Sequence, residues 1–108
     1  MHLTIRDLEQ RSGLARRTIH YYARRGLLPG PECLGRGATY SEEHLLRLRL
    51  IPALKAAGLR LEGVGCLLDA MPTKQMRQLC EACDQIRDLP GLLEWLVAQR
   101  LLTPSSHE

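Results

Sequence analysis

The chain has 108 residues, 44% of them hydrophobic, which suits one small domain with a core and an appended helical segment. It has no apolar run near the roughly twenty residues of a membrane-spanning helix and no basic-then-apolar secretory start, so we expect a cytoplasmic protein. Residues 1–60 carry a net charge of +6, and residues 61–108 carry a net charge of −3. Ten of the eleven cations in residues 1–60 are Arg. This basic, arginine-rich segment favours a polyanionic partner such as DNA over a merely solvated basic surface.

Two short helices joined by a tight turn are predicted near the N-terminus. Thr4 can cap a first helix with Asp7 at its third position, and Gly13 can end it because glycine tolerates a left-handed backbone. A second helix is expected over residues 15–25. A connection of a few residues that contains glycine is typical of a helix-turn-helix.

The second predicted helix has an apolar face and a basic face. Leu14, Ile19 and Tyr22 are spaced to point inward. Rows at helical spacing on the opposite face contain Arg16, Arg17, His20, Tyr21 and Arg24. Such a face can enter a major groove and reach base edges and phosphates, and a solvated basic face is the alternative.

The segment 30–40 is too rich in Gly and Pro for a helix. Gly35 and Gly37 on either side of Arg36 predict the turn of a short β-hairpin, with a plain surface loop as the alternative.

A third helix is predicted to begin after Ser41, where a capping hydroxyl precedes two glutamates, and to end at Gly58. Pro52 lies inside this span and predicts a kink or an early break. The face expected to be buried consists of Leu45, Leu48, Ile51 and Leu54.

Three further helices are expected in the acidic part of the chain. They span residues 61–70, about fifteen residues from Thr73, and residues 92–102 after a break at residues 88–91, with a disordered tail beyond. The last of these helices carries more apolar surface than one face can hide, so we expect it to meet the core, a second subunit or both. The expected interface residues are Met76, Leu79, Cys83, Ile86, Trp95 and Leu96.

Cys80 and Cys83 stand at i, i+3 spacing, so two copies of the chain could offer four thiolates to a zinc ion. Both also lie in an apolar seam, where free cysteine is a common buried residue. We interpret them first as core residues, with metal binding and redox sensing as alternatives. Cys33 and Cys66 lack partners at ligand spacing, and the scattered histidines, His2, His44 and His107, are interpreted as satisfied or solvated.

An enzyme is disfavoured and no cofactor is expected. The chain has no glycine-rich phosphate loop followed by Lys-Ser/Thr, no nucleophile elbow and no carboxylate pair in a defined pocket.

The stretch TIRDLEQRSGLARRTIHYYARRGLLPGP, followed by TYSEEHLLRLRLI and AAGLRLEGVGCLLD, resembles the DNA-binding domain of the MerR family of bacterial transcription regulators. The resemblance covers residues 2 to about 70. It implies a mostly α fold, with a winged helix-turn-helix and a small β-hairpin wing over residues 1–71. The sequence pattern itself predicts the two short C-terminal helices that follow, in a dimerisation or partner-docking region over residues 72–108.

The same resemblance implies a homodimer that binds a pseudo-palindromic operator in double-stranded DNA and deforms it, with RNA polymerase as a further partner. The residues expected at the DNA are Arg16, Arg17, Thr18, His20, Tyr21, Tyr22, Arg24, Arg36 and Tyr40.

The chain departs from the family pattern at a few positions. His20 replaces the usual Arg, and Ala23 the usual Glu; Ala15 replaces a polar helix cap, and Ala38-Thr39 stand where the wing commonly has an Arg. Short helices replace the long dimerisation helix, and no separate effector domain is expected. Two other functions stay open: an architectural or excisionase-like DNA-binding accessory protein, and a protein-interaction module that uses the last apolar helix.

Overall fold

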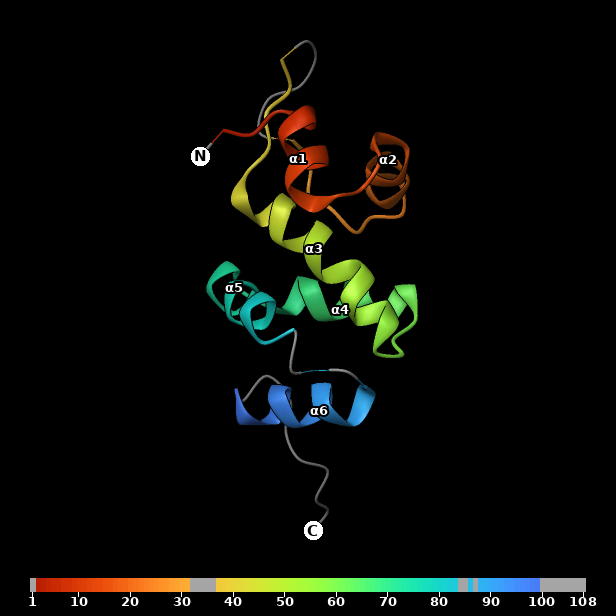
Figure 1. Ribbon diagram of the computed structural model, residues 1–108, viewed down its shortest axis with the longest axis vertical. Helices are drawn as coiled ribbons and strands as arrows, with labels where there is room; N and C mark the ends of the chain where they lie inside the picture. The colour runs from red at the N-terminus through yellow and green to blue at the C-terminus, as the bar shows by residue number, and fades with distance from the viewer. Residues whose placement is uncertain (1, 32–36, 84–85, 87, 100–108) are drawn as a thin grey trace.

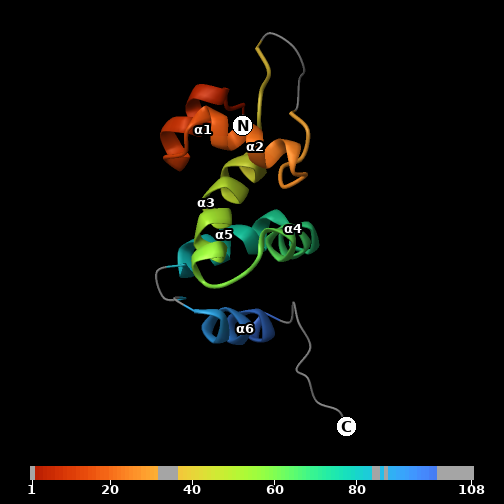
Figure 2. The same cartoon turned by 90° about the vertical axis from the view of Figure 1, so that its right-hand side faces the viewer.

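The computed structural model describes residues 2–31, 37–83, 86 and 88–99. This part of the chain is mostly helical. Its helices are α1 (Ile5–Ser12), α2 (Arg16–Arg24), α3 (Glu42–Ala56), α4 (Leu61–Ala70), α5 (Thr73–Ala82) and α6 (Leu89–Ala98). They are stacked along one axis, with α1 and α2 at one end, α3, α4 and α5 in the middle and α6 at the other end (Figures 1 and 2).

The first helix pair forms as predicted. Thr4 Oγ1 accepts a hydrogen bond from the Asp7 N–H at 3.1 Å, and Asp7 Oδ2 accepts one from the Thr4 N–H at 2.9 Å, which completes the capping box of α1. Gly13 has a φ of 78° and ends the helix by donating to the Glu9 carbonyl. Only residues 13–15 separate α1 from α2, so the helix-turn-helix connection is confirmed. Ala15 leaves α2 without a side-chain cap.

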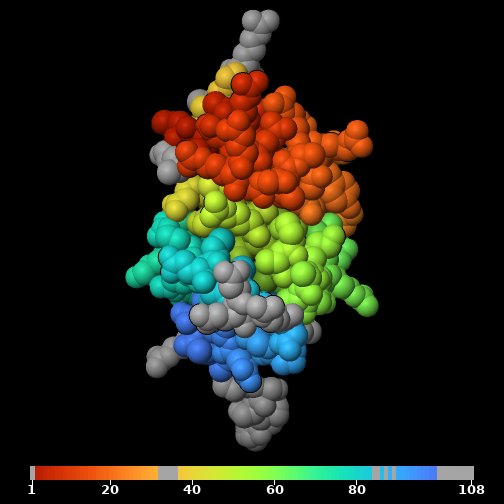
Figure 3. Space-filling model, viewed as in Figure 1, coloured from red at the N-terminus to blue at the C-terminus, as the bar shows by residue number. Residues whose placement is uncertain are grey.

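Helix α3 is the centre of the fold and packs against α1, α4 and α5. The space-filling view shows the same order of layers, with the side chains of α3 between the red and orange end and the green, cyan and blue end (Figure 3). The expected single buried face of α3 is too narrow, because three helices cover it from different sides. Its buried residues are His44, Leu45, Leu46, Arg47, Leu48, Leu50, Ile51 and Leu54.

Pro52 does not break α3, which continues to Ala56. A proline inside a helix costs about 3 kcal/mol through a lost hydrogen bond and a steric clash. Ile51 and Leu54, on either side of it, are 0% and 2% exposed. Burial of such side chains contributes about 1.5–3 kcal/mol each, which offsets the cost. The early break is therefore contradicted, whereas the kink given as its alternative stays a prediction.

The C-terminal helices differ from the prediction in their bounds. Helix α5 ends at Ala82 and is therefore shorter than about fifteen residues. Helix α6 begins at Leu89 because Asp88 caps it: Asp88 Oδ1 accepts a hydrogen bond from the Gly91 N–H at 2.9 Å. Pro90 lies in the first turn, where its missing N–H costs nothing. The segment predicted as a break is thus a helix start, and the residues from 100 onwards lie outside the described ones.

The predicted hairpin falls largely on residues 32–36, including Gly35 and Arg36, which lie outside the described part of the chain. Gly37 has a φ of 72°, as a turn requires. Tyr40 forms an isolated antiparallel bridge with Leu3, with N–H···O distances of 2.9 and 2.8 Å. This bridge fixes the end of the segment to the start of the chain, and a two-stranded wing stays a prediction.

Arg47 connects α3 to α4 and to the turn that follows α2. Only 7% of it is exposed. Its Nη1 donates to the Leu27 carbonyl and to Asp69 Oδ1, both at 3.0 Å, and its Nε donates to Glu43 Oε2 at 3.1 Å. A buried guanidinium needs such partners to compensate for its lost hydration. The network therefore satisfies Arg47 and fixes the end of the α2 region against α3 and α4.

We expect Arg47→Ala to lower the free energy of unfolding by about 2 kcal/mol, since it leaves a buried carbonyl without its charged donor. Arg49→Ala is the matched control, because Arg49 is exposed on the same helix, and its effect should stay within about 0.5 kcal/mol. Urea unfolding followed by circular dichroism measures both. Equal effects of the two substitutions would contradict the structural role of Arg47.

Candidate nucleic-acid interface

Helix α2 separates its apolar and basic side chains as the sequence predicts. Ile19 is 1% exposed and Tyr22 is 7% exposed, and both belong to the core, while Leu14 packs partly buried against it. Thr18 is half-buried. The exposed side of α2 carries Arg16, Arg17, His20, Tyr21 and Arg24.

A hollow of about 270 Å³ lies where the start of α1, helix α2 and residues 37–40 meet. Arg16 and His20, one turn apart on α2, line it together with Tyr40. The fold thus brings together three of the residues expected at the DNA. Arg16 Nη2 donates to Glu9 Oε1 on α1 at 3.1 Å, which orients a guanidinium that stays half-exposed.

Tyr21 lies beside a cation that the sequence interpretation missed. The Tyr21 hydroxyl accepts a hydrogen bond from Arg25 Nη1 at 3.1 Å, and the Arg25 guanidinium carbon lies 5.8 Å from the centre of the tyrosine ring. Arg25 also pairs with Glu62 on α4 at 3.5 Å. The i, i+4 spacing of Tyr21 and Arg25 is the signal that could have identified this contact.

Two residues predicted at the DNA stand apart from this surface. Tyr22 belongs to the core, with its ring 5.7 Å from that of Tyr21, so its main contribution is to support the helix. Its predicted contact with DNA is limited to the 7% that is exposed. Arg36 lies outside the described residues.

His44 is a buried residue whose role the sequence did not reveal. Its Nδ1 accepts a hydrogen bond from the Ser41 N–H at 3.0 Å, so Nε2 carries the proton and donates to the carbonyls of Pro29 and Gly30 at 3.0 and 3.1 Å. This arrangement holds the segment after α2 against the start of α3. The Ser-x-x-His spacing of a capping box is the signal that could have identified it.

Cys80 is half-buried and packs against the core. Burial, with a smaller effect of nearby Cys83, raises the pKa of the Cys80 thiol to about 11, and its Sγ lies 4.0 Å from the Leu46 carbonyl. A raised pKa disfavours the thiolate that metal binding and redox chemistry need. Within the described ranges, no three His, Cys, Asp or Glu residues are grouped so that they could hold a metal ion. Cys33 lies outside those ranges.

The expected interface residues divide into two groups. Met76 and Leu79 are 0% exposed and Leu96 is 3% exposed, so the chain's own core already covers them. The neighbouring helices bury these three side chains, so we correct their assignment to a partner surface. The other three, which are partly buried and pack against that core, are Cys83, Ile86 and Trp95.

None of the helices described here is both long enough and apolar enough to cross a membrane.

A tight helix pair whose second helix exposes a basic face defines a helix-turn-helix DNA-binding protein. The model of the MerR HTH family regulatory proteins matches residues 3–71, well over half of the chain. The chain belongs to this family and is a DNA-binding transcription regulator.

No curated protein matches the chain. Among solved structures, it is similar to the transcription regulator PbrR691 from Ralstonia metallidurans CH34 in complex with lead(II). The identity is 26%, the match covers 92% of this chain and 68% of that chain, and the TM-score is 0.47.

We expect Cys80 to react with iodoacetamide at pH 8 at least about tenfold more slowly than exposed Cys66, because little thiolate forms below a pKa of about 11. The rate at Cys80 should rise with pH up to that value. Mass spectrometry of alkylated peptides measures both sites, and the urea-unfolded chain, in which the two rates should converge, is the control. Equal rates in the folded protein would show that Cys80 is not protected.

Proposed function

We propose that this regulator binds a pseudo-palindromic operator in double-stranded DNA as a homodimer, with α2 of each subunit in a major groove. The observation that carries the proposal is the hollow lined by Arg16, His20 and Tyr40, which adjoins the exposed basic face of α2. A helix bearing cations on one side and core residues on the other can lie in a groove without unfolding any part of the domain.

The exposed residues of α2 differ in which part of the DNA their side chains can contact. Arg17 and Arg24 have long side chains suited to base edges or phosphates. Tyr21, paired with Arg25, offers a hydroxyl and an adjacent cation to the DNA backbone. In this proposal Arg16, His20 and Tyr40 surround one phosphate, and Arg36 in the predicted wing contacts a flanking phosphate. His20 contributes less charge at neutral pH than an arginine would.

The subunit contact is proposed for the region around α5 and α6. Cys83, Ile86 and Trp95 are partly buried in the single chain and can be covered further by a second copy. RNA polymerase is the further partner expected at a promoter, and no catalytic activity is assigned to the chain.

We expect Arg17→Ala and Tyr21→Ala each to weaken DNA binding by about 1–3 kcal/mol, that is, roughly 5- to 150-fold. Fluorescence anisotropy with a duplex selected from a random pool measures the affinity, and the complex should contain two chains per duplex. Lys55→Ala, which removes an exposed cation in the last turn of α3, away from α2 and from the proposed subunit contact, is the matched control and should leave the affinity unchanged. If both α2 variants bind the duplex as tightly as the original protein, α2 is not the helix that contacts DNA.

A further inference from the structure

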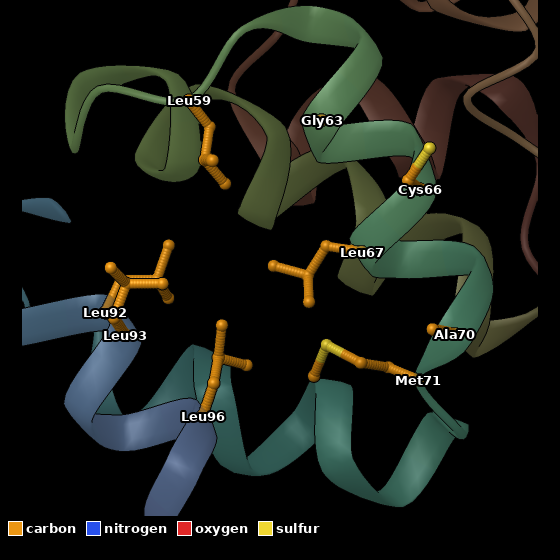
Figure 4. Close-up of a pocket in the computed structure, with 9 residues that line it drawn as sticks. All are labelled: Leu59, Gly63, Cys66, Leu67, Ala70, Met71, Leu92, Leu93 and Leu96. Carbon is orange, nitrogen blue, oxygen red and sulfur yellow. The ribbon is translucent and has the colours of Figure 1, made fainter. Parts of the chain in front are cut away.

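An apolar cavity of about 290 Å³ lies between α4 and α6. Figure 4 shows side chains from both helices, together with Leu59 from the turn after α3, surrounding an open space. Leu67 and Met71 approach it from one side, and Leu93 and Leu96 approach it from the other. On the α4 side, Gly63 and Ala70 contribute little or no side chain, which leaves the space open.

The lining indicates what can occupy the cavity. None of its nine residues is charged, so a charged ligand would lose its hydration without gaining a partner. The volume lies near the lower end of small-molecule sites, which span about 300–1,000 Å³, and an apolar cavity of only about 150 Å³ can bind benzene. The lining and the volume therefore fit a neutral, apolar small molecule.

A second protein molecule fits this place less well. Leu93 and Val97 are the large apolar residues of α6 that are exposed among the described residues, at 44% and 36%. These two side chains form only a narrow apolar rim, and the proposed subunit contact uses other residues, namely Cys83, Ile86 and Trp95. The concave shape and the small apolar rim both favour a ligand over a docked helix.

Helix α4 lies between this cavity and the end of the α2 region. A Cβ atom on Gly65 would stand 3.0 Å from Leu27 Cδ2, so α4 is in close contact with the turn after α2. Asp69 of α4 accepts a hydrogen bond from Arg47, which also donates to the Leu27 carbonyl. A displacement of α4 by a ligand would therefore be transmitted to the segment that holds α2.

We infer that the cavity between α4 and α6 is an effector site: it binds a neutral apolar small molecule and thereby changes the affinity for DNA. The binding half of this inference is independent of the DNA-binding proposal, and the regulatory half rests on it.

Titration with the neutral fluorophore N-phenyl-1-naphthylamine tests the binding half. We expect saturable fluorescence enhancement with one site per chain and quenching of Trp95, the one tryptophan of the sequence. Leu93→Glu should weaken binding at least tenfold, because it places a charge in the apolar lining. Val97→Glu is the matched control, because Val97 is similarly exposed on α6 but does not line the cavity. The affinity of this variant for the probe should stay within twofold of that of the original chain. Circular dichroism checks that both variants remain folded.

The same probe tests the regulatory half on the selected duplex. It should change DNA affinity in the original chain and in Val97→Glu, but not in Leu93→Glu. Saturable probe binding with no binding to the selected duplex would support the cavity site and refute the proposed operator binding. Probe binding with unchanged DNA affinity would refute the effector role. Absence of saturable binding, or equal binding by both variants, would overturn the site. Self-association that Leu93→Glu abolishes would assign the cavity to a second copy instead.

Discussion

Helix α3 presents apolar side chains around most of its circumference, so other helices must cover it from several directions. Helices α1, α4 and α5 do so, and α2 is in turn held against α1 by a connection of three residues. The position of α2, the helix proposed to bind DNA, therefore depends on how the other helices pack around α3. Burial of α3 is also strong enough to keep Pro52 within a continuous helix.

Two polar residues of α3 make this dependence specific. Arg47 binds the Leu27 carbonyl, and His44 binds the carbonyls of Pro29 and Gly30. Both fix the backbone that follows α2, where apolar packing alone would leave the direction of the chain loosely determined. Because a buried donor without a partner is costly, these bonds favour one position of that segment. The exposed face of α2 gains its orientation from them.

Helix α4 connects the hydrogen-bond network of Arg47 to a second site, the apolar cavity. One of its faces contacts the turn after α2 through Gly65 and Asp69, and another borders the apolar cavity beside α6. A ligand in that cavity and DNA on α2 would then act on opposite sides of one short helix. Coupling between the two sites requires only that they favour different positions of α4.

The sequence by itself determined the features that depend on neighbouring residues: the capping box of Thr4 and Asp7, the tight connection to α2, the bounds of α4 and the division of α2 into two faces. The family resemblance over residues 2 to about 70 agrees with the matched residues 3–71. Tertiary structure alone decided that Met76 and Leu79 lie in the core and that Arg47 and His44 bind carbonyls up to twenty residues away in sequence. The reason is physical: capping and periodicity are local, whereas burial and buried hydrogen bonds depend on which distant segments the core brings together.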